Sequence, residues 1–195
     1  EGCDPEHIEL LRQVVNNVRA AGIMVVASAG NSGSGSGESY CKMVDEPPAM
    51  YDAATTVGAT DSYNDAIASF SSRGTGTDLI KPDVVAPGVG VVSSVPGDYV
   101  ALPGTSMAAP HVAGVVALIW SARPDLRGDV ATTEQLLTST ALPLTSTQCG
   151  EAADAVPNRV YGWGRVDALA AVLKATDTTT NRRYYMPLTV LQVME

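Results

Sequence analysis

The sequence predicts an α/β fold in which a parallel sheet is flanked by helices, and three observations lead to it. The run IMVVASA at 23–29 is apolar throughout and follows a segment with helical spacing, as expected for a buried parallel strand. The run ATTVGAT at 54–60 has the same character, and 105–122 is a long, almost wholly apolar helix. Hydrophobic residues make up 45% of the 195, enough for one domain with a substantial core.

The elements are predicted in order along the chain. The first helix spans 6–21 and is followed by Gly22 as a stop signal, with Asp4 as its N-cap and Pro5 at its first position. Its apolar side chains recur at helical spacing: Ile8, Leu11, Val14, Val15 and Val18. Further strands are expected at 23–29, 53–60, 67–71, 84–86 and 89–95, with a short edge strand at 100–102. Further helices are expected at 105–122, 132–141 and 166–175.

Residues 1–175 are expected to form one domain, or part of one, and 176–195 a tail whose composition changes to a polar TTTNRR stretch. The start EGCDPEH has neither a Met nor a basic segment, so we expect it to lie in the middle of a longer chain rather than in a signal peptide. The formal charge of −9 makes nucleic acid an unfavourable partner. No apolar run reaches the roughly 20 residues of a membrane span.

Three cysteines leave two interpretations open. All three could be reduced thiols, or Cys3 and Cys41 could form a bridge while Cys149 stays free or pairs outside the chain. A bridge would require an oxidising compartment. No cysteine or histidine spacing indicates a zinc site.

The segment 104–114, GTSMAAPHVAG, places Ser106 at the start of the apolar helix. Free N–H groups and the positive dipole end of a helix suit the stabilisation of an oxyanion. The competing interpretation is that Ser106 or Thr105 merely caps the helix.

The segment 25–33, VVASAGNSG, places Asn31 on a glycine-flanked turn after a buried strand. Ligand sites of open α/β sheets lie at such strand ends, and an Asn amide can donate to an oxyanion. Taken alone, this segment favours the interpretation of Asn31 as a turn residue that tolerates left-handed backbone.

Taken together, these segments resemble the subtilisin-like serine peptidases. GTSMAAPHVAG is similar to the serine-bearing motif of that family and ASAGNSG to its oxyanion-hole segment. Between and after them, in the family's order, stand TVGAT at 56–60, ASFSSRG at 68–74, KPDVVAPG at 81–88 and YGWGRVDA at 161–168. The resemblance covers about 6–174 and implies a subtilisin-like fold lacking its N-terminal portion.

The resemblance implies a role for each matching position. Ser106 would be the nucleophile, and Asn31 with the Ser106 N–H would form the oxyanion hole. The S1 pocket and the substrate backbone would be contacted by Ala27, Ser28, Ala29 and Gly30. Pro47-Pro48 matches a position where the family often has a cis peptide bond.

The resemblance also implies partners and a location. Substrates would be polypeptides, an N-terminal propeptide is common, and the family is typically secreted. No cofactor is required. Structural calcium is frequent in the family, but the carboxylates available, Asp45, Asp52, Asp61 and Asp65, are better explained as exposed solubilising charge. The P1 preference is not readable from the sequence.

The sequence departs from a complete enzyme because it lacks the family's Asp and His segments, which precede the serine. Of its two histidines, His111 belongs to the serine motif as a helix residue and His7 lies in the first helix. We therefore expect the base in a preceding segment. The alternative is a non-catalytic binding module on the same fold. An α/β-hydrolase elbow, G-x-S-x-G, is excluded because Ala108 stands at its last position.

Overall fold

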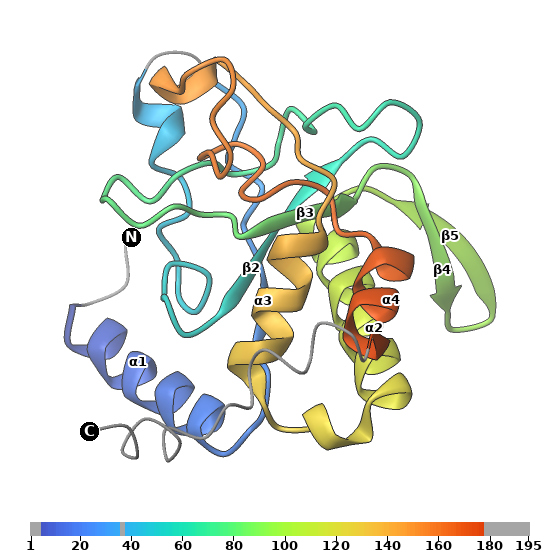
Figure 1. The fold of residues 1–195 in the computed structure, drawn as a ribbon. Helices are drawn as coiled ribbons and strands as arrows, with labels where there is room; N and C mark the ends of the chain where they lie inside the picture. The colour runs from blue at the N-terminus through green and yellow to red at the C-terminus, as the bar shows by residue number, and fades with distance from the viewer. Residues whose placement is uncertain (1–4, 36–37, 178–195) are drawn as a thin grey trace, which may run out of the picture.

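A computed structural model describes residues 5–35 and 38–177 (Figure 1). The proposed tail lies almost wholly outside this range, as do Cys3 and the predicted N-cap Asp4. The first helix, α1, spans Pro5–Ala20. Gly22 ends it as predicted, with a φ of +78° and its N–H bonded to the Arg19 carbonyl oxygen at 2.9 Å.

The main sheet has three parallel strands in the order β1 (Val26–Ser28), β2 (Thr55–Thr60) and β3 (Val84–Pro87). Val26 is aligned with Thr55, and Val57 with Val84. Every residue of β2 is buried. A central parallel strand is covered on both faces, and this explains its continuous run of small and β-branched residues. The parallel α/β prediction is confirmed.

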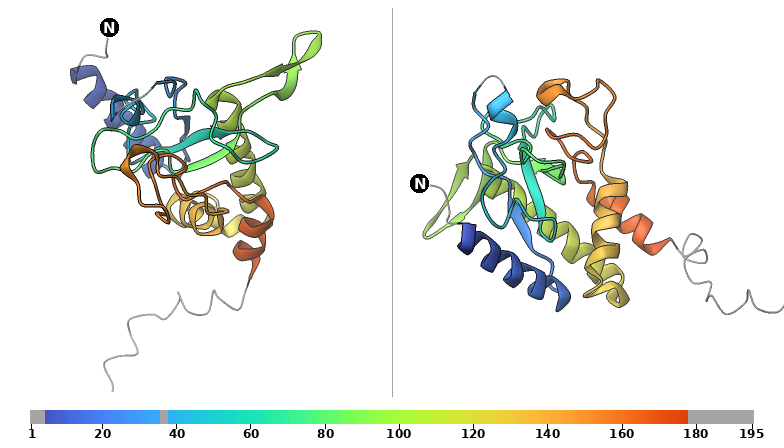
Figure 2. Two further views of the ribbon diagram at one scale, coloured as in Figure 1. Left: turned by 90° about the horizontal axis from the view of Figure 1, so that it is seen from above. Right: turned by 90° about the vertical axis from the view of Figure 1, so that its left-hand side faces the viewer.

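Two cores lie on the two faces of the sheet. One holds Val57, Val84 and the helices α2 (Thr105–Ala122), α3 (Val130–Thr140) and α4 (Ala168–Thr176). The other holds Ala27, Val44, Tyr51 and Val15 of α1. Successive strand residues point to opposite faces, so α1 and α2 lie on opposite sides of the sheet (Figure 2, right).

Helix α2 has the predicted bounds, but its almost wholly apolar sequence is buried on one side only. One side, including Ala108, Val112 and Ile119, packs across the three strands, while Leu118 on the opposite side is 52% exposed. By length and composition α2 could cross a membrane. Its contacts with the sheet and with α4 are those of a core helix.

The strands predicted at 89–95 and 100–102 are β4 (Val91–Val95) and β5 (Asp98–Leu102). They pair with each other in an antiparallel hairpin, apart from the main sheet, and project from the body (Figure 2, left). The turn uses Gly97, whose φ is +82°. The strand predicted at 67–71 is wrong: only Ile67 forms an isolated bridge, with Thr60.

The last two helices begin at aspartates. Asp129 caps α3 by accepting from Thr132 N at 3.0 Å, and Asp167 caps α4 by accepting from Ala170 N at 2.8 Å. Such caps satisfy the free N–H groups of a first turn. Three single-turn 3₁₀ helices complete the elements: η1 (Glu38–Cys41), η2 (Pro124–Leu126) and η3 (Gln148–Gly150).

Both interpretations of the cysteines are wrong for Cys41, which forms a disulfide with Cys149 across a Cα–Cα distance of 5.4 Å. The partners are 108 positions apart in the sequence. They meet because η1 and η3 lie together at one end of the molecule, where Arg73 Nη1 also donates to Gln148 Oε1 at 2.9 Å. Proximity of this kind is a tertiary property, so spacing did not reveal it.

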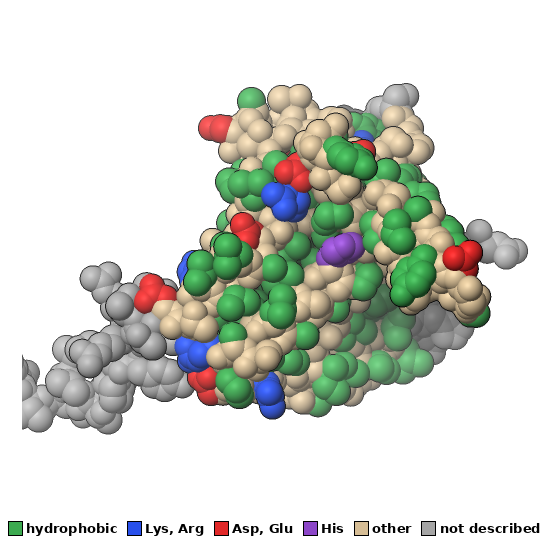
Figure 3. Space-filling view, turned by 90° about the vertical axis from the view of Figure 1, so that its right-hand side faces the viewer, with side chains coloured by type: hydrophobic (Ala, Val, Ile, Leu, Met, Phe, Trp, Pro, Cys, Tyr) green, Lys and Arg blue, Asp and Glu red, His purple; other side chains and the backbone are tan. Residues whose placement is uncertain are grey.

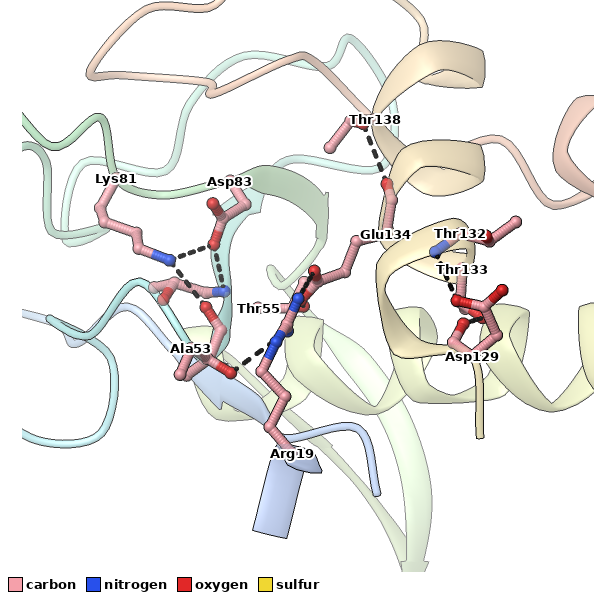
Figure 4. A network of polar contacts seen from close by, with 12 residues as sticks. Arg19, Ala53, Thr55, Lys81, Asp83, Asp129, Thr132, Thr133, Glu134 and Thr138 are labelled. Atoms are coloured by element: carbon pink, nitrogen blue, oxygen red, sulfur yellow. Dashed lines mark hydrogen bonds and ion pairs between the residues drawn. The ribbon is translucent and has the colours of Figure 1, made fainter. Parts of the chain in front are cut away.

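A network of charged side chains lies around Ala53 and Thr55, at the start of β2 (Figure 4). Lys81 is only 1% exposed, and its ammonium donates to Ala54 O at 2.7 Å and to Asp83 Oδ2 at 2.6 Å. The same oxygen accepts from Thr56 N at 2.7 Å. Burial raises the pKa of Asp83, and the neighbouring Lys81 opposes that rise. The KPD sequence thus anchors β3 against β2.

Candidate active site

The loop after β1 holds Asn31 between two backbone contacts with the segment 68–74. Ser72 N donates to Gly30 O at 3.0 Å, and Gly33 N donates to Phe70 O at 2.8 Å. Gly30 has a φ of +99°, a conformation that favours glycine. The ASFSSRG segment thus holds the backbone on both sides of Asn31 in place.

The start of α2 presents Ser106 at the surface. The N-cap is Gly104, with a φ of +149°, so neither Thr105 nor Ser106 occupies the capping position. The interpretation of Ser106 or Thr105 as a cap is therefore not what the structure shows. Ser106 lies in the first turn, where backbone N–H groups lack intrahelical partners and the dipole favours negative charge.

Thr105 joins these two segments. Asn31 Oδ1 accepts from Thr105 N at 2.9 Å and from Thr105 Oγ1 at 3.0 Å, and Thr105 Oγ1 in turn accepts from Gly30 N at 3.2 Å. Thr105 is fully buried. Because both contacts occupy the amide oxygen of Asn31, its amide nitrogen is left for another acceptor. Sequence reasoning missed this role, since a threonine beside a serine gives no distinguishing signal.

The two predicted oxyanion donors adjoin one small space. A Cβ placed on Gly104 would lie 3.7 Å from Asn31 Nδ2 and 3.7 Å from the backbone N of Ser106. A side chain at position 104 would thus lie close to both of these donors. This geometry brings Asn31 and Ser106 together, although they are far apart in the sequence.

A cavity of about 360 Å³ lies beside Asn31. The residues that line it include all four predicted substrate-binding residues, Ala27, Ser28, Ala29 and Gly30, and a second group from further along the chain: Met43, Asp45, Glu46, Pro47, Pro48 and Ala49. The Pro47-Pro48 bond is cis, which confirms the prediction. A larger cavity of about 590 Å³ lies at the Cys41–Cys149 disulfide and is lined by none of the predicted catalytic or substrate-binding residues.

The histidines do not complete the site in the part of the chain that is described. His111 Nδ1 lies 2.9 Å from Met107 O, one turn earlier in the helix. His7 lies in the first turn of α1, and its side chain is outside the described set. Over residues 9–35 and 39–177, no hydrogen bond joins Ser106 Oγ to an imidazole or a carboxylate. No group of three or more potential metal ligands occurs within the described residues.

An open apolar face surrounds the exposed side of α2 (Figure 3). The exposed positions of this helix are largely apolar and include Pro110, Ala113, Ala117 and Leu118, with His111 among them in the sequence. On the other side of the sheet, α1 exposes Leu10, Leu11 and Val14. Strand β1 pairs only with β2 among the described strands, so its other edge carries no ladder.

Comparison with known proteins gives a consistent result. The model of the subtilase family, Peptidase_S8, matches residues 4–164. The chain is 42% identical over 168 residues to Subtilisin Savinase of Lederbergia lenta, covering 86% of the chain and 52% of that protein. It is 49% identical over 121 residues to M-protease of Shouchella clausii strain KSM-K16, covering 62% of the chain and 28% of that protein.

Among solved structures, the Patellamide maturation protease PatA superposes with a TM-score of 0.66 at 29% identity. The match covers 89% of the chain and 57% of PatA. The chain therefore spans about half the length, or less, of the proteins it matches.

Proposed function

Because this chain belongs to the subtilase family, we propose that it is the nucleophile-bearing part of a serine endopeptidase that acts on polypeptides. The observation that carries the proposal is the convergence of Asn31 Nδ2 and the Ser106 N–H around one space beside Ser106. A capping serine needs no such partner, whereas an oxyanion hole needs two donors.

In the proposed mechanism, Ser106 Oγ attacks the scissile carbonyl carbon while a general base takes the hydroxyl proton. The carbonyl oxygen becomes an oxyanion, which accepts from Asn31 Nδ2 and Ser106 N. The base then protonates the leaving amine, and the C–N bond breaks to leave an acyl ester on Ser106. Water, deprotonated by the same base, attacks this ester and releases the acid, returning the proton to Ser106.

The protein's residues prepare this step before substrate arrives. Thr105 holds the Asn31 oxygen by two hydrogen bonds, which orients the amide nitrogen as a donor. The segment from Ala27 to Gly30 lines the cavity beside Asn31 and offers backbone to an extended substrate. Removing one such oxyanion donor in a related enzyme costs about 2.7–4 kcal/mol of transition-state stabilisation.

We propose that the base and its orienting carboxylate come from polypeptide outside these 195 residues. This polypeptide would pack along the edge of β1 and against the exposed sides of α1 and α2. Three exposed features support this: the apolar side of α2, the apolar side chains of α1 and the unpaired edge of β1. A single added layer with a strand beside β1 and a helix on each side would cover all three. His111 is not proposed as the base, because its Nδ1 already contacts Met107 O.

The Cys41–Cys149 disulfide supports an oxidising, extracellular location. Polypeptides are the proposed partners, with a propeptide as an expected one. Neither nucleic acid nor membrane insertion is proposed, and no cofactor is invoked for the chemistry. The carboxylates Asp45, Asp52, Asp61 and Asp65 are not assigned to calcium.

A fluorophosphonate probe tests the proposal on the full-length protein. We expect labelling that maps to Ser106, is abolished by Ser106→Ala and is slowed roughly 100-fold by Asn31→Ala, since the probe's phosphoryl oxygen occupies the oxyanion hole. His111→Ala should leave the labelling rate within about twofold. Absence of labelling in a folded full-length protein would favour a non-catalytic binding module and overturn the peptidase proposal.

A further inference from the structure

The cavity beside Asn31 has an acidic wall, and we propose that it selects an arginine or lysine side chain at P1 of the substrate. The residues that would carry this preference are Asp45 and Glu46. This inference rests on the proposed function, because it names the substrate class that the same site would accept.

The cavity combines two kinds of surface. Ala27, Ala29, Met43 and Ala49 are apolar, while Asp45 and Glu46 are acidic. Long cationic side chains have the same division, with an apolar stem and a charged head. Its volume of about 360 Å³ is near the lower end of the range for ligand clefts, roughly 300–1,000 Å³. A single extended side chain matches such a space better than a large ligand does.

The acidic segment has a fixed backbone. Met43 N donates to Arg73 O at 3.1 Å, and Val44 N donates to Gly74 O at 2.8 Å. On the other side, Met50 N donates to Glu46 O at 3.2 Å. Asp45 and Glu46 therefore belong to a segment whose backbone is held by hydrogen bonds on both sides. The fold thus fixes the backbone positions from which the two side chains extend.

Neither carboxylate is neutralised by a neighbour. Asp45 and Glu46 are exposed, and among the described residues neither takes part in an ion pair. The nearest basic residue in sequence, Lys42, lines the other cavity. The guanidinium of Arg73 donates to Gln148 Oε1 and to Ala68 O.

The negative charge at the cavity is thus available to a ligand, and the net charge of −9 acts in the same direction. Carboxylates that only increase solubility would also be exposed. Asp45 and Glu46 differ from them because they line the cavity beside the proposed oxyanion hole, where their charge would act on a bound side chain.

Product-like peptides test the proposal without requiring catalysis. Acetyl-Ala-Ala-Pro-Arg, the same peptide ending in citrulline and the same peptide ending in phenylalanine are titrated into the full-length protein by calorimetry. Citrulline keeps the shape of arginine but carries no charge. We expect the arginine peptide to bind roughly tenfold tighter than the citrulline peptide at low salt. The ratio should fall at about 1 M salt, where the Debye length is about 3 Å.

Variants assign the effect to the cavity. In Asp45→Asn/Glu46→Gln the ratio should fall to within about twofold. Asp78→Asn is the control, because Asp78 is exposed and lines the other cavity. Equal affinities for arginine and citrulline, no measurable binding of the arginine peptide, or an equal loss in Asp78→Asn would each overturn the proposal. Labelling of Ser106 by a neutral fluorophosphonate, measured on the same samples, reports the proposed function separately.

Discussion

Removing the Cys41–Cys149 disulfide should lower the free energy of unfolding of the chain by several kcal/mol. The bridge joins two short helices, η1 and η3, whose cysteines are far apart in the sequence. A cross-link restricts the unfolded chain, so its loss increases the entropy of that state. The relevant perturbation is Cys41→Ser/Cys149→Ser, because it removes both sulfurs and leaves no free thiol at either position.

The magnitude follows from the size of the closed loop. The cysteines are 108 positions apart, and the chain-entropy relation for a loop of that size gives about 4.8 kcal/mol at 25 °C. Removal of native disulfides typically costs about 2–5 kcal/mol. We therefore expect a loss of about 3–5 kcal/mol, a large share of the roughly 5–15 kcal/mol that holds a typical domain folded.

Urea denaturation, followed by circular dichroism, measures this loss with and without a thiol reductant. The oxidised wild-type chain should unfold at the highest urea concentration. The reduced wild type and the double variant should coincide at a lower one, with a larger dependence on urea because their unfolded states are more open. The reductant should not affect the double variant. A wild-type midpoint that stays unchanged after mass mapping shows both thiols free would refute the entropic reasoning.

Three further changes act on the core and the candidate site. Lys81→Met leaves the partly buried carboxylate of Asp83 without its cation, so the free energy of unfolding at neutral pH should fall by about 3 kcal/mol, the lower end for a broken buried pair. Part of this lost stability should return as the pH falls through the raised pKa of Asp83 toward 3.8, because the native state binds the proton before the unfolded state does. Denaturation midpoints measured across this pH range check the prediction. Thr105→Val leaves Gly30 N without an acceptor and should lower the free energy of unfolding, measured by denaturation, by about 1–3 kcal/mol. It should also slow fluorophosphonate labelling, because Asn31 Oδ1 loses one of its two donors. Gly33→Ala should destabilise the chain by about 1–3 kcal/mol or more, because its Cβ would lie 1.9 Å from a backbone oxygen; thermal unfolding measures this.

Each of these changes has a matched control. Lys174→Met removes an exposed lysine and should leave stability within about 0.5 kcal/mol. Thr105→Ser keeps the hydroxyl and should restore most of the labelling rate. Gly114→Ala adds a methyl group where no atom lies within 4 Å, so in the 195-residue chain it should be neutral or stabilising. If Lys81→Met loses stability equally at every pH, the assignment to Asp83 is wrong.

Local features were the ones that the sequence predicted well. Helix α2 has its predicted bounds because a glycine precedes a long apolar stretch, and both signals are contained within the helix itself. The predicted start of α3 was two residues late and that of α4 two residues early, because each helix begins directly after its aspartate cap, Asp129 or Asp167, and not where the apolar repeat begins. The strand expected at 67–71 failed for the opposite reason: five residues of mixed character do not distinguish a strand from a turn.

The sequence by itself determined the chemical types at the candidate site: a serine at a helix start, an asparagine after a buried strand, and their order along the chain. Only the tertiary structure decided how they meet. It showed Thr105 bonded to Asn31, Cys41 paired with Cys149, and Asp45 and Glu46 on the wall of a cavity. Periodicity and capping act over a few residues, whereas these contacts join segments that only the packing of the whole sheet brings together.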